Sequence, residues 1–396
     1  MFVEDVAVPV IYNNSRWLGL DGRVFIDNTD RGIARTGGIN TCGLLGDNSV
    51  VTKNSPVTTS GGGTTWCQIS AGDAHTAAIK TDGTAWTWGL NTCGRLGDNT
   101  VLPRSSPVPP SGTNANWCQI SAGGSHTAAI KFDGVTWTAW TWGLGSSGQL
   151  GNNTISCRCS PVAVTHASGN ILWCEISAGH CHTAAVKTDG TAWTWGNNIF
   201  GQLGDSTVAA KSSPVAIAGT NSNWCQISSG KYHTTAIKTN GTAWTWGRND
   251  CGQLGDDALT PKSSPGTLAG GGTTWCQIDA GTAHTAAIKK DGTAWTWGAN
   301  YCGQLGDSTV AARPSPGTVS NQGTTWCQIS AGHCHTAAVK TDGTAWTWGR
   351  NSGCQLVNGG TVDRSSPGTI TGGITSWCQI SAGCFHTAAI TLTRSA

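Results

Sequence analysis

The sequence has 396 residues, of which 23 are Lys or Arg and 21 are Asp or Glu. This low and balanced charge gives neither the basic surface typical of nucleic-acid binding nor an acidic tail. Gly occurs 56 times and Trp 21 times, and no apolar run approaches the roughly 20 residues that cross a bilayer. The composition excludes a helical or disordered chain and favours short strands joined by tight turns.

Residues 1–19 are interpreted as a short N-terminal segment and a candidate anchor, followed by a single domain over residues 20–396. The first ten residues, MFVEDVAVPV, contain Glu4 and Asp5 where a secretion signal carries basic residues. We therefore expect no Sec-type signal peptide at this end.

A repeat occupies the rest of the chain. The motif W-C-[QE]-I recurs every 51 residues, with one spacing of 56, and begins at Trp66, Trp117, Trp173, Trp224, Trp275, Trp326 and Trp377. A histidine follows nine residues after each of these tryptophans: His75, His126, His182, His233, His284, His335 and His386. A fixed period of this kind is typical of solenoids and propellers. The longer unit, which begins at Trp117, contains GVTWTAWTWG and so repeats one step of its third strand.

Each unit predicts four short strands in chain order. W-C-Q-I-S-A forms the first and H-T-A-A-I-K the second, and an Asp-Gly pair such as Asp82-Gly83 predicts a two-residue hairpin turn. T-A-W-T-W forms the third strand, whose alternation places Trp86 and Trp88 on one face. The segment around S-S-P-V predicts an outer edge strand, where proline is tolerated because no donor to the ladder is needed.

The two ends of the chain complement one another. The last unit, from Trp377, stops after two strands, whereas the N-terminal region supplies a degenerate turn and third strand at LDGRVF (Leu20–Phe25) and the following loop at Gly38–Asn48. Strands from both ends that share one sheet close a ring and remove its open edge. The prediction is an all-β fold, a seven-bladed β-propeller of four-stranded blades closed by N- and C-terminal strands.

The pattern S-A-G-x-x-H-T-A-A-I-K-T-D-G-T-A-W-T-W-G-x-N-x-x-G-Q-L-G resembles the repeat of the regulator of chromosome condensation family, from about Leu20 to Ile390. The resemblance implies a seven-bladed propeller closed by strand exchange. The functions it implies are varied: exchange factors for small GTPases, chromatin binders, secreted hydrolase inhibitors, and virion or adhesin components. The exchange factors use a basic N-terminal tail and an inserted wedge hairpin, and neither feature is present in this sequence. In style the near-identical units look closest to bacterial or phage structural propellers.

Positions that are identical in every unit are interpreted as scaffold. Each repeated histidine is expected to hydrogen-bond local backbone and fix its turn, and the tryptophans are expected to form the core. The cysteine of each W-C-Q-I is expected to share a strand face with Ile and to be buried as a small hydrophobe. The H-C-H triplets at His180–His182 and His333–His335 lack the partners of a zinc site, so we expect no metal and no cofactor.

Positions that differ between units are interpreted as recognition sites. They lie between A-G and His and just after W-G, and the strand directions place both loops at one end of every blade, with the DG turns at the other. Diversified loops on a rigid scaffold often carry binding function; neutral drift at exposed turns is the alternative. The candidate binding residues on this variable face are Lys231, Tyr232, Arg248, Asp250, Tyr301, Arg350, Phe200 and Phe385.

No nucleophile elbow, phosphate loop or shared acid pair is found, so we expect no catalysis. The acids of the repeated L-G-D, Asp205, Asp256 and Asp307, are expected to cap turns. The leading hypothesis is a binding or structural propeller on a virion or cell exterior, which contacts a protein or a glycan. The alternative is an intracellular, cytoplasmic regulator of a small GTPase, and a hydrolase would require clustered acids near Asp73 and Asp250. No nucleic-acid partner and no membrane span are expected.

Overall fold

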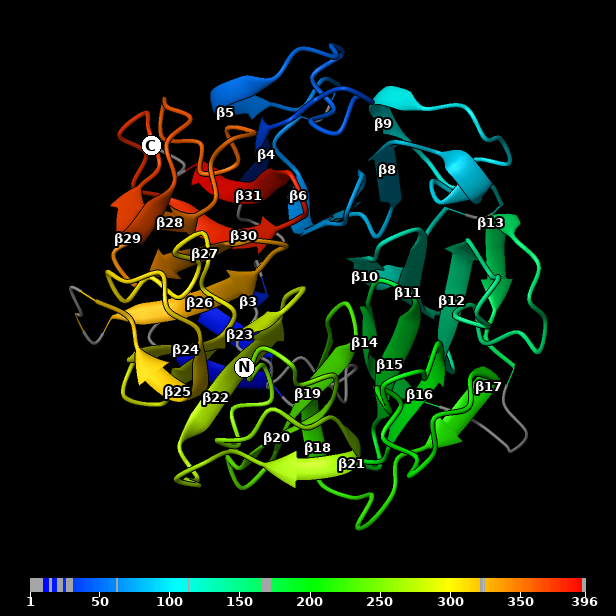
Figure 1. Ribbon diagram of the computed structural model, residues 1–396. Coiled ribbons are helices and arrows are strands. Elements are labelled where there is room, and N and C mark those ends of the chain that lie inside the picture. The colour runs from blue at the N-terminus through cyan, green and yellow to red at the C-terminus, as the bar shows by residue number, and fades with distance from the viewer. Residues whose placement is uncertain are drawn as a thin grey trace.

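The computed structural model describes residues 31–393, apart from residues 62, 113, 166–171, 321–322 and 324, together with three short strands nearer the N-terminus. Seven antiparallel sheets of four strands surround a central axis as the blades of a propeller (Figure 1). This confirms the predicted all-β class, the blade number and the four strands per blade. The three N-terminal strands pair in chain order as a separate small sheet: β1 (Val10–Asn13), β2 (Arg16–Gly19) and β3 (Val24–Phe25).

The blades are numbered here by their order in the chain, and their strands run from the axis outward. Blade 1 contains β6 (Trp66–Ala71), β7 (His75–Lys80), β8 (Ala85–Gly89) and β9 (Arg104–Val108), with a short 3-10 turn, η1 (Thr92–Gly94), in its outer loop. Blade 2 contains β10 (Trp117–Ala122), β11 (His126–Phe132), β12 (Trp137–Gly143) and β13 (Arg158–Ala163). Blade 3 contains β14 (Trp173–Ala178), β15 (His182–Lys187), β16 (Ala192–Gly196) and β17 (Lys211–Ala216). Blade 4 contains β18 (Trp224–Ser229), β19 (His233–Lys238), β20 (Ala243–Gly247) and β21 (Lys262–Thr267).

The remaining blades follow the same plan. Blade 5 contains β22 (Trp275–Ala280), β23 (His284–Lys289), β24 (Ala294–Gly298) and β25 (Arg313–Thr318). Blade 6 contains β26 (Trp326–Ala331), β27 (His335–Lys340), β28 (Ala345–Gly349) and β29 (Arg364–Thr369). Blade 7 contains β30 (Trp377–Ala382), β31 (His386–Thr393), β4 (Arg31–Gly38) and β5 (Lys53–Thr58).

Blade 7 closes the ring with strands from both ends of the chain, as predicted, but the N-terminal strand is not the predicted one. Strand β4 pairs with β31 from His386↔Gly38 to Thr393↔Arg31, whereas Val24–Phe25 of LDGRVF pairs with β2 instead. In β4 the sequence A-R-T-G-G takes the place of A-W-T-W-G, and the loss of both tryptophans hid the strand from the repeat pattern. The boundary between residues 19 and 20 lies beside residues outside the described part and stays a prediction.

In blades 1 and 3–6 the turn between the second and third strands contains three residues instead of the predicted two, whereas in blade 2 the Asp133 amide donates to the Thr136 carbonyl around a two-residue turn. In blade 1 the Lys80 amide donates to the Thr84 carbonyl, so three residues form the loop, and Gly83 occupies the left-handed region at φ 75°. The Asp82 carboxylate accepts hydrogen bonds from the amide and the hydroxyl of Thr84, and the Trp86 indole donates to that same hydroxyl. The repeated D-G-T-A-W therefore orients the outer tryptophan as well as the turn.

Tryptophans fill the spaces between blades, as predicted. In blade 1 the Trp66 ring lies edge-on against Trp86 and Trp88, with ring centroids 6.4 and 6.0 Å apart. Trp66 and Trp88 are fully buried, and the ammonium group of Lys80 lies over the rings of Trp66 and Trp86. Edge-to-face pairs and stacked cations add to the area that these rings bury. Trp66 and Trp88 belong to one buried cluster with Ala388 and Ile390 of blade 7, so Trp, Ile and Ala side chains together join these neighbouring blades.

The cysteines of W-C-Q-I do not behave as the simple alternation predicted. A β-bulge between the Trp and the Gln of this motif interrupts the register in every blade, and the cysteine is its extra residue. Only Cys378 of these seven is buried, whereas Cys118 and Cys327 are exposed. All seventeen cysteines lie in the described part of the chain, and none of them forms a disulfide bond there.

Candidate functional site

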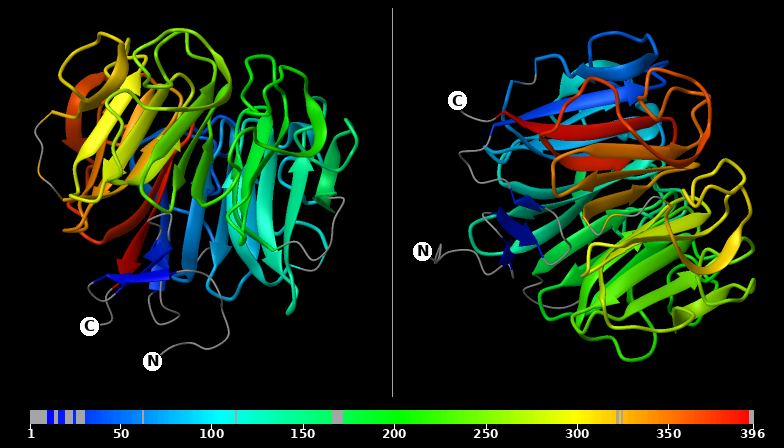
Figure 2. Two further views of the ribbon diagram at one scale, coloured as in Figure 1. Left: turned by 90° about the horizontal axis from the view of Figure 1, so that it is seen from below. Right: turned by 90° about the vertical axis from the view of Figure 1, so that its left-hand side faces the viewer.

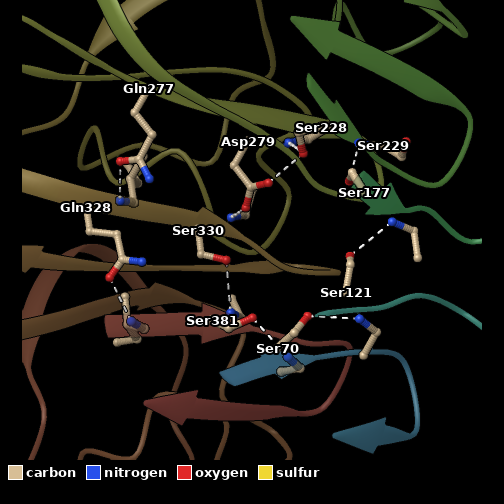
Figure 3. Close-up of a pocket in the computed structure, with 18 of the residues that line it drawn as sticks. Ser70, Ser121, Ser177, Ser228, Ser229, Gln277, Asp279, Gln328, Ser330 and Ser381 are labelled. Atoms are coloured by element: carbon tan, nitrogen blue, oxygen red, sulfur yellow. Dashed lines mark hydrogen bonds between the residues drawn. The ribbon is translucent and has the colours of Figure 1, made fainter. Parts of the chain in front are cut away.

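Two rings of side-chain hydrogen bonds surround the central axis and join each inner strand to the next (Figure 3). In one ring the side-chain oxygen of the W-C-[QE]-I glutamine accepts from an Ile amide of the next blade, as Gln277 does from Ile329 at 2.9 Å. In the other ring a serine hydroxyl accepts from an Ala amide, as Ser330 does from Ala382 at 3.0 Å. Both rings are complete, with Glu175 and Asp279 replacing one Gln and one Ser. The polar cavity that they enclose has a volume of about 150 Å³.

The repeated histidines bond the neighbouring blade and not their own turn, which corrects the prediction. Each ring is fully buried, and its Nε2 lies 2.8–3.0 Å from a threonine hydroxyl of the next blade. That hydroxyl donates its only hydrogen to a loop carbonyl, as Thr285 does to Gln253 at 2.8 Å. The hydroxyl must therefore accept from the histidine, which assigns the neutral tautomer with its proton on Nε2. Burial lowers the pKa of His233 to about 3.

The two variable loops of each blade lie at the same end, as predicted. In blade 4 the Arg248 amide donates to the Tyr232 carbonyl at 2.8 Å, and in blade 3 the Asn197 amide donates to Cys181 at 2.9 Å. The small sheet β1–β3 and the end of β31 lie at the opposite end, with the DG turns (Figure 2). We call the end with the diversified loops the variable face.

An ion pair crosses the mouth of the central channel on the variable face. The mouth has a volume of about 80 Å³ and is lined by Asp73, His180, Lys231 and His333, among others. His180 of blade 3 reaches across blade 2, and its Nδ1 lies 2.6 Å from the Asp73 carboxylate of blade 1. Blade 2 has Gly124 at this position, where a Cβ atom would lie 2.6 Å from the His180 ring. The glycine therefore leaves the space that the bridge requires.

The hydrogen bond between His180 and Asp73 favours the charged form of both groups. It raises the pKa of His180 to about 10, so this imidazole is a cation at neutral pH. Desolvation near the axis opposes ionisation of Asp73, but the hydrogen bond from His180 and the positive charge around it, including that of Lys231, together hold the pKa of that carboxyl below its usual value. The centre of the variable face therefore has a fixed imidazolium beside Lys231.

An aromatic and cationic cluster extends from this bridge over blades 3 and 4. The rings of Phe200 and Tyr232 meet edge-on with centroids 5.3 Å apart, and the Arg248 guanidinium lies over both, 5.3 and 5.6 Å from their centres. Lys231 lies 5.6 Å from the centre of the Tyr232 ring. We call these four residues and His180 the blade 3–4 cluster. Arg248 also pairs with Asp250, whose pKa this contact holds below the usual value although desolvation opposes it.

Three of the predicted binding residues lie on blades other than 3 and 4. Tyr301 of blade 5 is exposed and its hydroxyl lies 3.8 Å from the Cys334 thiol, whereas Arg350 of blade 6 donates to the Ser352 hydroxyl. Phe385 of blade 7 packs near the His333 ring, at a centroid distance of 6.3 Å. The predicted residues therefore lie on one face but in separate groups, with the largest group on blades 3 and 4.

The acids of the variable face form no shared pair. Asp73 is bonded to His180 and Asp250 to Arg248, so each carboxylate has its own cation. The L-G-D acids cap turns as predicted: the Asp205 carboxylate accepts from the amide and the hydroxyl of Thr207. Among the described residues, no group of three or more His, Cys, Asp and Glu side chains is arranged to hold a metal ion. No helix in the part of the chain that the structure describes is long and apolar enough to cross a membrane.

Asp73 and His180 are the site residues that sequence reasoning did not select. Both lie at variable positions of the repeat. They belong to units two repeats apart, and neither unit by itself indicates that their side chains meet. The glycine at position 124 was the available signal, because in the other six units a residue with a side chain stands at this position. The role of Gly124 becomes clear only when the blades on either side of it are known to converge at the axis.

Comparison with known proteins agrees with this architecture. A family model described as "RCC1-like domain" matches residues 33–389. The Ultraviolet-B receptor UVR8 of Arabidopsis thaliana is 30% identical over 335 residues, covering 82% of this chain and 74% of the receptor. The human E3 ubiquitin-protein ligase HERC2 is 28% identical over 281 residues, which cover 69% of this chain but 6% of that protein.

The fold is also similar to a solved structure. Yeast RCC1 (Prp20), in its crystal structure bound to Kap60, superimposes with a TM-score of 0.80 at 19% identity, covering 94% of this chain and 91% of the yeast chain. At this identity the likeness shows the shared propeller alone. The match of the family model over nearly the whole described ring, together with the identity to the plant receptor, establishes that the chain belongs to the RCC1-like domain family.

Proposed function

We propose that this propeller is a non-catalytic binding protein that docks a protein partner through the blade 3–4 cluster. The observation that carries the proposal is the convergence of Phe200, Tyr232, Arg248 and Lys231 on two neighbouring blades, at positions where the sister blades differ. Tyr and Arg are the residues most enriched at binding hot spots. The ammonium of Lys231 adds positive charge beside the His180–Asp73 and Arg248–Asp250 ion pairs, so the cluster suits a partner segment with acidic residues.

A protein is favoured over a glycan by the packing of the rings. Sugars stack on open aromatic faces, whereas Phe200 and Tyr232 meet edge-on and share the Arg248 guanidinium. The resemblance to yeast RCC1, solved in complex with Kap60, supports the same class of partner. Placement on a virion or cell surface stays a prediction, and so does the alternative of a regulator of a small GTPase.

The test replaces residues of blade 4 with their counterparts from blade 5. Because the two blades have the same fold, the loops of blade 4 are expected to tolerate these residues. The variant Lys231→Thr, Tyr232→Ala, Arg248→Ala gives blade 4 the residues that blade 5 has at Thr282, Ala283 and Ala299. We expect partner affinity to fall by about 100-fold, since two or more hot-spot side chains are lost. The measurement is calorimetric titration of a partner identified by quantitative affinity capture with the wild-type chain.

A matched control changes the other face. Asn240→Asp gives blade 4 the DG turn of its sisters and leaves the variable face untouched, so partner affinity should stay within about twofold. Equal capture by the wild type and the triple variant would exclude the blade 3–4 cluster as the docking site. Acceleration of nucleotide release from a small GTPase would favour the alternative.

A further inference from the structure

Exposed apolar side chains are confined almost entirely to the variable face. Among the described residues thirteen large hydrophobic side chains are exposed, and Val135, in the β11–β12 turn, is the one that lies on the opposite face. The other twelve lie on loops of the variable face: Val50, Val51, Val101, Leu102, Ile155, Ile199, Val208, Leu259, Tyr301, Val310, Val362 and Phe385. Single exposed hydrophobes are ordinary on a protein surface, but such a one-sided distribution is not.

Seven of these residues recur once in each blade. They lie in the loop between the third and the outer strand, three residues before the outer strand begins in six blades and two residues before it in blade 6. Their side chains are 55–76% exposed: Val50, Val101, Ile155, Val208, Leu259, Val310 and Val362. We call them the rim tips. The rim-tip position is aliphatic in all seven blades although its side chain is exposed. Packing within a blade therefore does not explain why it is aliphatic.

The loops that carry the rim tips are rigid. In blade 1 the Asp98 carboxylate accepts three hydrogen bonds. One comes from the side-chain amide of Asn91, and two come from the backbone amide and the hydroxyl of Thr100. The amide of Asn99 donates to the Cys159 carbonyl of the next blade at 2.8 Å, and an equivalent bond joins every neighbouring pair around the ring. The loops that carry the rim tips are thus fixed around the circumference, and these loops lie on the side away from the small sheet β1–β3 (Figure 2).

A basic residue follows each rim tip two or three positions later in the chain. The first residue of the outer strand is Lys or Arg in all seven blades: Lys53, Arg104, Arg158, Lys211, Lys262, Arg313 and Arg364. In five blades it pairs with the L-G-D aspartate, as Arg104 does with Asp98 at 2.8 Å. Blades 2 and 6 have Asn152 and Asn358 at that position, and their cations, Arg158 and Arg364, are exposed.

We propose that the rim tips dock the propeller, with its variable face down, on the surface of an anionic lipid bilayer. Aliphatic tips that enter the acyl boundary, with exposed cations such as Arg158 and Arg364 at the level of the headgroups, are the composition that binds this interface. A bilayer offers the same chemistry to all seven tips, whereas a protein partner without sevenfold symmetry engages only some of them.

This docking mode places the blade 3–4 cluster at the membrane surface, because the cluster and the rim tips share one face. A partner bound by the cluster would then be a membrane-associated protein or a juxtamembrane segment. The inference about the bilayer stands without the proposed partner, since vesicles alone test it.

The experiment is co-sedimentation of the full chain with phosphatidylcholine vesicles that contain about 30 mol % phosphatidylserine. The test variant is Val101→Ser, Val208→Ser, Leu259→Ser, Val310→Ser, which removes four tips whose side chains are not part of the core. We expect the wild type to bind and the variant to lose at least about tenfold in its partition coefficient. Val135→Ser, which removes the exposed aliphatic side chain of the opposite face, should bind as the wild type does.

Tryptophan fluorescence and near-ultraviolet circular dichroism establish that each variant is folded, and sedimentation velocity reports self-association. Failure of the wild type to bind the anionic vesicles, or equal binding by the four-tip variant, would overturn the proposal. Self-association that depends on the rim tips, without vesicle binding, would also overturn it and identify a second copy of this chain as the occupant.

Discussion

At the scale of the residue, the glycine before each variable pair is required by the neighbouring blade. In each A-G-x-x-H the Cα of this glycine lies close to a carbonyl of the next blade, and a Cβ there would approach that oxygen to 2.4–2.5 Å. The residue that follows donates its amide to the same carbonyl, as Lys231 does to Gly281. These seven bonds form a closed ring around the axis, so the glycine permits an inter-blade contact and not a special turn.

Gly230→Ala is expected to destabilise the propeller by about 1–3 kcal/mol, because the new methyl group meets the Gly281 carbonyl at 2.4 Å and the His233 ring at 2.8 Å. The control is Gly360→Ala, where the nearest atom is 3.6 Å away and the backbone is not left-handed. This change should stay within about 0.5 kcal/mol. Urea unfolding followed by tryptophan fluorescence measures both, and equal midpoints for the two variants would contradict the steric argument.

At the scale of the element, one threonine ties the second strand of each blade to two parts of the preceding blade. Thr285 at the start of β23 accepts from His233 of blade 4 and donates to the Gln253 carbonyl in the outer loop of that same blade. The His-Thr pair of H-T-A-A-I therefore links the second strand and the outer loop of one blade to the second strand of the next. This explains why both residues are constant although neither lies at the variable face.

Thr285→Val keeps the shape of the side chain but removes the hydroxyl. The buried Nε2–H of His233 and the Gln253 carbonyl both lose their partner, so we expect a loss of about 1–3 kcal/mol for each unsatisfied group. Thr318→Val, at the exposed end of β25, is the matched control and should change stability by less than about 0.5 kcal/mol. If the two valine variants unfold at the same urea concentration, the His-Thr contact does not contribute to stability.

At the scale of the whole molecule, seven buried neutral imidazoles make the ring sensitive to acid. Burial lowers the pKa of His126, His182, His233, His284 and His335 from 6.5 to about 3 and that of His386 to about 4, and it holds the pKa of His75 well below 6.5. Below pH 6.5 the unfolded chain binds protons that the folded chain excludes. Stability is therefore present above that pH and is lost as the pH falls towards the folded-state values.

We expect the free energy of unfolding to fall steeply between about pH 6 and pH 4, by up to about 1.4 kcal/mol per pH unit for each histidine. Urea titrations across this range measure the slope, and the number of protons taken up on unfolding follows from it. The control is His180, whose pKa of about 10 gives the opposite sign, since its contribution is lost between about pH 6.5 and 10. An unfolding free energy that is flat between pH 6 and 4 would contradict the assignment of neutral buried rings.

Much of the ring was predictable from the sequence, because the residues that are identical in every repeat are those that the fold of each blade requires. The spacing of W-C-[QE]-I determined seven blades, and the DG turns and tryptophan pairs located their strands and their core. The direction of the strands also placed the variable loops at one end. These features depend on local geometry and on contacts that are the same between all neighbouring blades.

Only the tertiary structure revealed the contacts between blades and the one strand that departs from the repeat. Strand β4 lacks the tryptophans of its sisters, so only its pairing with β31 reveals that it closes the ring. The repeated histidines bond a threonine about fifty residues away in the sequence, and a period alone does not tell a contact within a blade from one between blades. The Asp73–His180 bridge, the blade 3–4 cluster and the rim tips arise because the ring brings loops from separate blades to one face. Such convergence is a property of the closed circle, and the sequence of any single blade does not contain it.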